Sequence, residues 1–190
     1  MEFSGKKVTV VGTGISGIGA VGLLNAVGAE VVLYDGNEKL KIEDIEKKLG
    51  TYKAEIVLGE LTKELTDSSD LLVISPGVPI DSPVVKAFEA AGVPVWGEVE
   101  LAYAFDKGKV LAITGTNGKT TTTALVGQIV GAYHKDTFVV GNIGNPYTTE
   151  VLKSNKDSYT VAEISSFQLE TVHEFHPLVS AILNITPDHL

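Results

Sequence analysis

Short apolar runs that resemble β-strands alternate with helix-like segments along almost all of the 190 residues. Five such runs lie within residues 7–97, and a second series begins at residue 109. Alternation of this kind predicts parallel sheets with crossover helices. We therefore predict an α/β protein with two parallel sheets, a linking helix at residues 98–108 and a domain boundary near residue 108.

The composition is that of a globular protein, with 44% hydrophobic residues. Apolar runs are short, and none approaches the roughly 20 residues needed to span a bilayer. The N-terminal segment MEFSGKKVTVVG lacks the apolar core of a secretory signal. We expect a cytoplasmic protein. The absence of cysteine excludes disulfides, zinc thiolate sites and thiol nucleophiles.

The charge of the chain limits which ligands it can hold and how. The formal net charge is -9, and acidic residues outnumber lysines within residues 1–108. This balance argues against a nucleic-acid surface. The sequence contains no arginine, so all its side-chain cations other than histidine are lysines. Any bound phosphate must therefore be held by backbone N–H groups, lysine, hydroxyls or a metal.

A first glycine loop, VGTGISG, occupies residues 11–17 and matches GxGxxG at Gly12, Gly14 and Gly17. It follows a strand-like run and opens a helix, and Asp35 ends the next strand-like run. This context is typical of dinucleotide binding, in which a pyrophosphate meets the helix N-terminus. Any nucleotide diphosphate satisfies the same physics. A tight turn without a ligand is the structural alternative, and Asp35 could equally be a turn residue.

A second glycine loop, ITGTNGKTT at residues 113–121, resembles the Walker A pattern GxxxxGK(S/T). It is a variant, because the first glycine of that pattern would fall on Ile113. We expect Lys119 to neutralise phosphate charge and the Thr120 hydroxyl to reach Mg²⁺. The alternative is a glycine turn with an incidental lysine. The predicted ATP-binding residues are Gly115, Thr116, Asn117, Gly118, Lys119, Thr120 and Thr121.

Two ionisable residues follow later strand-like runs. Glu163 closes SYTVAEI, where burial of an acid is costly unless a cation compensates it. A metal or a lysine is the expected partner, and a solvent-exposed strand end is the alternative. His189 follows a strand that ends near Ile185, where open α/β sheets collect ligands. His189 suits a metal or a proton-transfer role, although a lone histidine is often structural.

Together these motifs resemble those of the Mur ligases of bacterial cell-wall synthesis. GTNGKTT is shared with folate-polyglutamate ligases, whereas EISSFQLE together with SPGVP is similar to the D-glutamate-adding branch. The resemblance extends along the whole chain, through VGTGISG, SPGVP, GEVELA, TGTNGKTTTT, GNIG, EISSFQLE and LNITPDHL.

The resemblance implies a ligase that activates the terminal carboxylate of UDP-N-acetylmuramoyl-L-alanine with ATP. An acyl phosphate forms, the amine of D-glutamate attacks it, and ADP and phosphate leave. It also implies a Rossmann-like UDP-substrate-binding domain at residues 1–97, a linker helix at 98–108 and an incomplete P-loop ATPase-type α/β domain at 109–190. The family's C-terminal domain would be absent, so we expect an inactive chain. We further expect a monomer with no nucleic-acid or membrane partner.

The resemblance also implies roles for individual residues. The catalytic residues would be Lys119, Asn142, Glu163 and His189. The UDP-substrate residues would be Ile15, Ser16, Gly17, Asp35, Gly36, Ser75, Pro76, Gly77, Val78 and Asn142. Ligands of Mg²⁺, with two sites in the full-length enzyme, would include Thr120, Glu163 and His189. Family members use an arginine shortly after the aspartate at position 35, but Gly36 and Asn37 stand there in this sequence, so the uracil contacts do not transfer directly.

Two other functions compete with a ligase. An NAD-dependent oxidoreductase explains the first glycine loop and leaves the second without a role. A non-catalytic nucleotide-binding module is compatible with both loops. An enzyme that holds a nucleotide-linked substrate at the first loop and ATP at the second gives each loop a function.

Overall fold

The computed structural model describes residues 2–187. Its strands are β1 (Lys7–Val11), β2 (Glu30–Asp35), β3 (Glu55–Leu58), β4 (Leu71–Ile74), β5 (Val95–Gly97), β6 (Lys109–Thr114), β7 (Thr137–Gly141), β8 (Tyr159–Glu163) and β9 (Val179–Ile182). Its helices are α1 (Ile15–Ala26), α2 (Ile42–Leu49), α3 (Lys63–Ser68), α4 (Pro83–Ala90), α5 (Glu98–Tyr103), α6 (Lys119–Tyr133), α7 (Tyr147–Glu150) and α8 (Ser166–Leu169), and a 3-10 turn at Val151–Lys153 follows α7.

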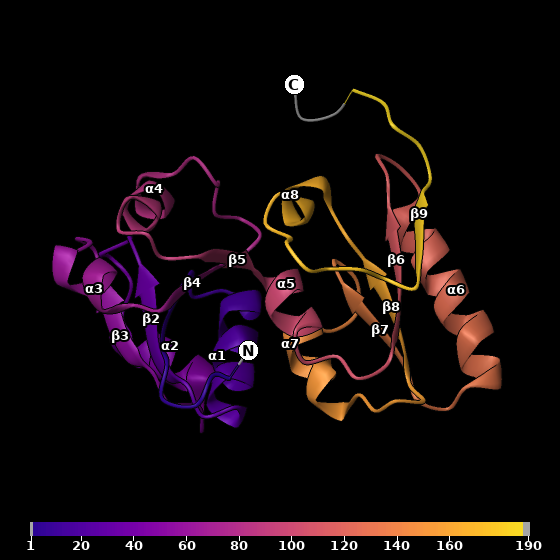
Figure 1. The fold of residues 1–190 in the computed structure, drawn as a ribbon, viewed down its shortest axis with the longest axis horizontal. Coiled ribbons are helices and arrows are strands. Elements are labelled where there is room, and N and C mark those ends of the chain that lie inside the picture. The colour runs from indigo at the N-terminus through magenta and orange to yellow at the C-terminus, as the bar shows by residue number, and fades with distance from the viewer. Residues whose placement is uncertain (1, 188–190) are drawn as a thin grey trace.

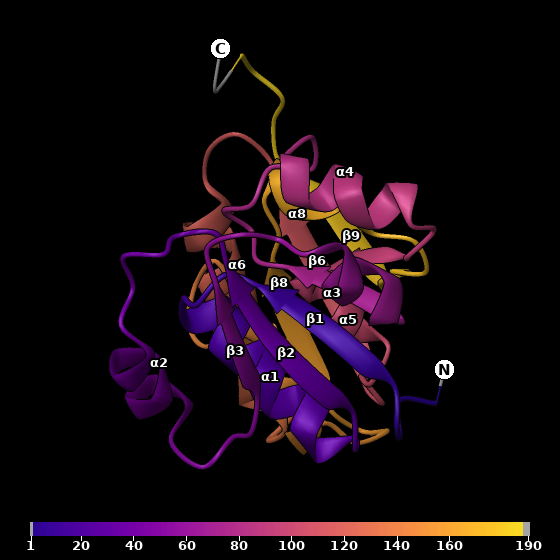
Figure 2. The same cartoon turned by 90° about the vertical axis from the view of Figure 1, so that its left-hand side faces the viewer.

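The first sheet has the order β3-β2-β1-β4-β5, and all its strands are parallel. The chain continues from β1 to one side of the sheet and from β4 to the other, so the loops after these two neighbouring strands lie at a topological switch point, where α/β sheets bind ligands. Figure 2 looks onto this part of the molecule, with β1, β2 and β3 side by side and α2 beyond β3. The predicted Rossmann-like parallel sheet is confirmed.

The second sheet has the order β7-β8-β6-β9 and is also parallel. Ile113 of β6 and Gly141 of β7 both pair with Glu163 of β8, and Thr114 of β6 pairs with Ile182 of β9. The loops that follow these four strands therefore share one edge of the sheet. The glycine loop at residues 115–118 is one of them.

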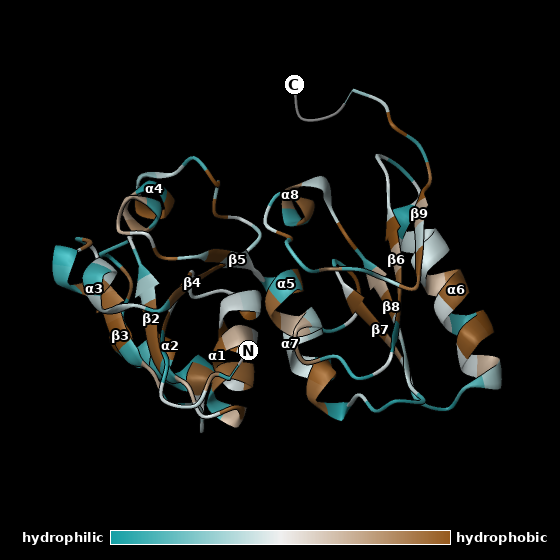
Figure 3. Ribbon diagram, in the orientation of Figure 1, coloured by the Kyte–Doolittle hydropathy of each residue, from teal (hydrophilic) through white to brown (hydrophobic). Residues whose placement is uncertain are grey.

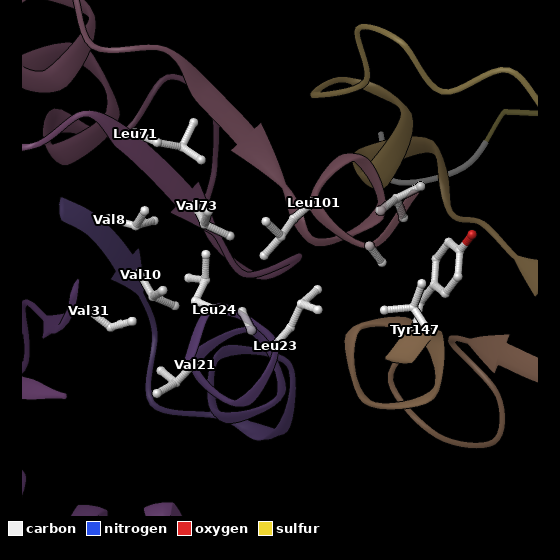
Figure 4. Close-up of a cluster of buried hydrophobic side chains, with 14 of the residues drawn as sticks. Val8, Val10, Val21, Leu23, Leu24, Val31, Leu71, Val73, Leu101 and Tyr147 are labelled. Carbon is white, nitrogen blue, oxygen red and sulfur yellow. The ribbon is translucent and has the colours of Figure 1, made fainter. Parts of the chain in front are cut away.

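A continuous apolar core connects the two sheets. Buried side chains from one face of the first sheet pack on α1 and α5, and the same cluster continues through Leu101 to Tyr147 and Ala162. Figure 4 shows this path from the strands through Leu23 and Leu101 to Tyr147. A second cluster, which includes Phe88 of α4, covers the other face. Figure 3 shows that hydrophobic residues concentrate on the strands of the first sheet.

The linking segment lies between the two sheets (Figure 1) but is helical only in part. The linker helix predicted at residues 98–108, with a break from Asp106 to Gly108, ends earlier than expected, because α5 stops at Tyr103. The Asp106 carboxylate instead accepts hydrogen bonds from Gly108 N at 2.7 Å, Tyr147 Oη at 2.7 Å and Thr160 Oγ1 at 2.8 Å. These bonds turn the chain into β6. The domain boundaries themselves stay a prediction.

Within residues 2–187, none of the helices is both long enough and apolar enough to cross a membrane.

Candidate functional site

The first glycine loop folds back tightly between β1 and α1. Gly12 has φ 104°, and a Cβ atom on Gly17 would overlap the Gly12 carbonyl oxygen, so both positions require glycine. Gly14 is the N-cap of α1 and, as a glycine, has no side chain that could cap the helix. The first N–H groups of α1 have no intrahelical acceptors, and such groups form a favourable anion site.

Asp35 braces this loop from the end of β2. Its Oδ2 atom accepts hydrogen bonds from Thr13 Oγ1 at 3.0 Å and Thr13 N at 3.3 Å, and its Oδ1 atom accepts one from Asn37 N at 3.1 Å. Lys48 of α2 donates from Nζ to Thr13 O at 3.3 Å. The aspartate therefore shapes the loop, and Lys48, which sequence reasoning missed, brings a positive charge to it.

The loop after β4 meets the first glycine loop, as the switch point requires. Ser75 N donates to Val11 O at 3.1 Å, and a Cβ atom on Gly12 would lie 2.8 Å from Ser75 Oγ. Ser75 Oγ is buried and has no hydrogen-bond partner among the described residues. Val78 N donates to Ser75 O at 2.9 Å and closes a turn over residues 75–78. The structure thus brings residues 75–78, predicted to contact the substrate, beside the first glycine loop. In that loop Ile15, the first residue of α1, is exposed.

The second glycine loop joins β6 to α6 through residues in left-handed conformations. Gly115 has φ 140° and Gly118, the N-cap of α6, has φ 84°. Lys119 Nζ donates to Gly115 O at 2.7 Å and to Thr116 O at 3.1 Å. Its ammonium group therefore lies on carbonyls of its own loop. Thr120 and Thr121 are exposed in the first turn of α6.

Asn184, which sequence reasoning did not single out, holds the second glycine loop in place. Its Oδ1 atom accepts from Asn117 N at 2.8 Å, and its Nδ2 atom donates to Asn117 O at 2.8 Å. Its backbone oxygen accepts from Thr116 N at 3.1 Å. The available signal was an amide side chain just after an apolar strand, inside the motif LNITPDHL.

Glu163 lies at the edge shared by these loops and is 3% exposed. Its Oε2 atom is buried without a hydrogen-bond partner in the described part of the chain. Asn142, which is exposed, donates from its backbone N to Glu163 O at 3.3 Å. An unpartnered buried carboxylate oxygen is costly without a cation, so this position fits a hard divalent cation.

Residues 2–187 contain no cluster of three or more His, Cys, Asp or Glu side chains that could hold a metal ion. Thr120 is the second residue of α6, the helix that follows β6. Strand β6 pairs with β8 at Glu163. The predicted catalytic and metal residue His189 lies outside the described residues.

A cavity of about 500 Å³ opens beside the second glycine loop. Its walls include Gly115, Lys119, Ser166 and Asn184. This volume is in the range of small-molecule sites. Ser165 also lines it, but its hydroxyl is used to cap α8: Ser165 Oγ accepts from Gln168 N at 3.3 Å in a capping box.

Glu98 lies between the first glycine loop and the start of α7 and is 5% exposed. Its carboxylate accepts hydrogen bonds from the hydroxyl of Ser16, from Thr148 Oγ1 at 3.3 Å, and from the backbone N–H groups of Tyr147 and Thr148. Burial raises the pKa of Glu98, and these four hydrogen bonds oppose the rise. The carboxylate joins the first turn of α1 to the start of α7.

Comparison with known proteins identifies the family. Residues 6–97 match the profile of the N-terminal domain of MurD-like Mur ligases, and residues 113–190 match that of the Mur ligase middle domain. Proteins named UDP-N-acetylmuramoylalanine--D-glutamate ligase from Lachnospira eligens and Lachnoclostridium phytofermentans are 72% and 60% identical to this chain over its whole length. The chain spans 42% of the length of each.

A solved structure supports the fold. The UDP-N-acetylmuramate:L-alanyl-gamma-D-glutamyl-meso-diaminopimelate ligase from Neisseria meningitides superposes with a TM-score of 0.59 at 19% identity, over 98% of this chain and 62% of that protein. At this identity the likeness concerns the fold alone. From the two profile matches and the two relatives, this chain belongs to the Mur ligase family and carries sequence of its N-terminal and middle domains.

Proposed function

We propose that this chain is the part of a peptidoglycan-precursor ligase that binds UDP-N-acetylmuramoyl-L-alanine and ATP, and that the whole enzyme adds D-glutamate. The names of the relatives at 72% and 60% identity support the substrate class. Two separate glycine loops, each at the carboxyl edge of a parallel sheet, support two phosphate-bearing ligands. A cytoplasmic monomer without a nucleic-acid or membrane partner is part of this proposal.

The observation that carries the proposal is the buried, unpartnered Oε2 atom of Glu163 beside the second glycine loop. A glycine loop that merely turned the chain would not need a buried carboxylate at its side. In this proposal Glu163 and the Thr120 hydroxyl hold Mg²⁺, which supplies positive charge to the ATP phosphates when bound. His189 remains the expected ligand of a second metal ion.

On the substrate side, the proposal is that backbone N–H groups of residues 15–17 bind the diphosphate. Residues 75–78 would line the same binding site. Asp35 and Gly36 would lie near the uracil. Lys48, hydrogen-bonded to this loop at 3.3 Å, is the basic side chain best placed to compensate the diphosphate charge. This role suits a chain without arginine, where lysine and backbone donors must hold phosphate.

The proposed reaction proceeds in two displacements. A carboxylate oxygen of the L-alanine residue attacks the γ-phosphorus, and ADP leaves. The neutral amine of D-glutamate then attacks the acyl carbon, phosphate leaves, and the amide nitrogen loses a proton. Both partners of the first step are anions, so alignment and charge neutralisation dominate. Lys119 would exchange its loop carbonyls for phosphate oxygens, and Asn142 would lie between the γ-phosphate and the reacting carboxylate.

Calorimetric titration of the 190-residue chain with UDP-N-acetylmuramoyl-L-alanine tests this proposal. We expect heat of binding from the wild type and none from Ser16→Trp, which fills the first glycine loop. NADH should give no heat. Heat from NADH alone would favour the oxidoreductase, and no heat from the UDP substrate would refute the proposal. Because the chain spans 42% of its relatives' length, we expect no D-glutamate-dependent ADP release from these residues alone.

A further inference from the structure

The short helix α7 is capped by a side chain that is distant in sequence. Its N-cap residue is Pro146, and no capping bond from that side chain exists. The first N–H groups of a helix need acceptors. The carboxylate of Glu98 accepts from the N–H groups of Tyr147 and Thr148, and so performs the capping from α5. Helix α7 directly follows the loop at residues 141–145, which contains Asn142.

The same carboxylate also holds Ser16 of the first glycine loop. Packing around this junction is close: a Cβ atom on Gly19 of α1 would lie 2.7 Å from Thr148 Oγ1 and 3.1 Å from Thr149 Oγ1. In Figure 1, α1, α5 and α7 meet between the two sheets. Glu98 therefore lies where a shift of either loop region would break its hydrogen bonds.

We propose that Glu98 is a positioning residue that fixes the first glycine loop, through Ser16, relative to the loop at residues 141–145, through the capped end of α7. The inference rests on the proposed function, in which the first loop binds the diphosphate and Asn142 faces the reacting carboxylate. One substrate would then be held at both ends by loops whose separation Glu98 sets. Because the Ser16 hydroxyl is bonded to Glu98, Ser16 would contact the diphosphate through its backbone N–H group.

Glutamine is the sharpest replacement for Glu98. Four donors meet the two carboxylate oxygens. A glutamine of the same size keeps one acceptor oxygen and turns an NH₂ group toward donors, so part of the network is lost without creating a cavity.

Glu100 provides a matched control on the same helix. It is 1% exposed, and its carboxylate accepts backbone N–H bonds from His173 at 2.8 Å, Glu174 at 2.8 Å and Phe175 at 3.2 Å. The bonds that it accepts within residues 2–187 lead to this segment and not to Ser16 or α7. Glu100→Gln thus perturbs an equally buried carboxylate network elsewhere.

The experiment compares wild type, Glu98→Gln and Glu100→Gln by calorimetric titration with UDP-N-acetylmuramoyl-L-alanine, well below each variant's Tm. We expect Glu98→Gln to raise Kd on the order of 10-fold, the effect of losing one charged hydrogen bond. Glu100→Gln should change Kd less than about 2-fold, even if its Tm falls as much. By NMR, amide exchange should accelerate at residues 147 and 148 in Glu98→Gln and at 173–175 in Glu100→Gln.

Each outcome decides the inference. Equal Kd changes in the two glutamine variants, or an unchanged Kd in Glu98→Gln, would overturn the positioning role and leave the proposed function intact. A wild type that binds no UDP substrate would overturn the proposed function and this inference with it. If Glu98→Gln does not fold, Glu98→Asp keeps the charge but withdraws it by one methylene. A raised Kd and faster exchange at residues 147 and 148 support the inference, and unchanged values reject it.

Discussion

Replacement of Glu163 by glutamine should stabilise the protein without ligands and abolish its stabilisation by Mg²⁺ with a nucleotide. The side chain is 3% exposed, and its Oε2 atom has no partner among the described residues. A buried group left unsatisfied costs about 1–3 kcal/mol, and more when it is charged. A neutral amide of the same shape removes the additional cost of burying a negative charge. We therefore expect the free energy of unfolding to rise by about 1–2 kcal/mol.

The ligand effect should have the opposite sign. A ligand that binds the native state at 100 times its Kd adds about 2.7 kcal/mol to the free energy of unfolding. Wild type should gain this amount from Mg²⁺ with a non-hydrolysable ATP analogue, whereas Glu163→Gln should gain little beyond what the analogue confers without metal. Urea unfolding followed by circular dichroism, with and without the ligands, measures both quantities.

Glu150 is the matched control for this experiment. It is 7% exposed, but both carboxylate oxygens have partners: Asn145 Nδ2 donates to Oε1 at 2.7 Å and Lys153 Nζ donates to Oε2 at 2.8 Å. Glu150→Gln should therefore lower the free energy of unfolding, because the buried carboxylate loses its charged bonds to Asn145 and to the exposed Lys153 ammonium. A destabilised Glu163→Gln that still responds to Mg²⁺ would refute the reasoning, since Glu163 would then be an ordinary buried acid and not a cation ligand.

Three further predictions concern the first glycine loop and its surroundings. Lys48→Met should raise the Kd for UDP on the order of five-fold in calorimetry, whereas Lys47→Met, whose lysine pairs with an aspartate of its own helix, should not. Gly17→Ala should cost about 1–3 kcal/mol in urea unfolding, because its Cβ atom would overlap the loop backbone; Gly14→Ala, with no atom within 4 Å, should fold normally. Burial raises the pKa of Glu98, so its contribution to stability is complete below the ordinary carboxyl range and is lost as pH rises through the raised pKa. Urea unfolding between pH 4 and 8 should show a flatter pH dependence in Glu98→Gln, and an unchanged slope would contradict this.

The sheets were predictable from sequence because parallel strands that are buried on both faces have short, almost continuous apolar sequences. The four residues of β4, LLVI, are all buried, and a run of this kind has few other structural uses. For Glu163 the same pattern allowed either burial beside a cation or an exposed strand end, and the structure shows a side chain that is 3% exposed.

The short helices α7 and α8 were not predicted, because segments of four residues are too short to show helical periodicity. Helix α7 has four residues and depends on Glu98, which precedes Thr148 by 50 positions. Helix α8 is equally short, but its capping box joins Ser165 to Gln168 and was visible in the motif EISSFQLE. Isolated helices of this length are not stable, so periodicity could not reveal them.

The lysine contacts at the candidate site are distant in sequence at the first glycine loop and local at the second, and they explain how an acidic chain can hold anionic ligands. Lys48 reaches the first glycine loop from 35 positions away, and Lys119 lies on the carbonyls of the second. In both loops, a lysine ammonium is hydrogen-bonded to a backbone carbonyl close to N–H groups that can bind phosphate. The net charge of -9 describes the surface as a whole, whereas a bound phosphate responds to the nearest charges. One lysine at each loop, with the free N–H groups of α1 and α6, gives each site a local positive potential despite the acidic surface.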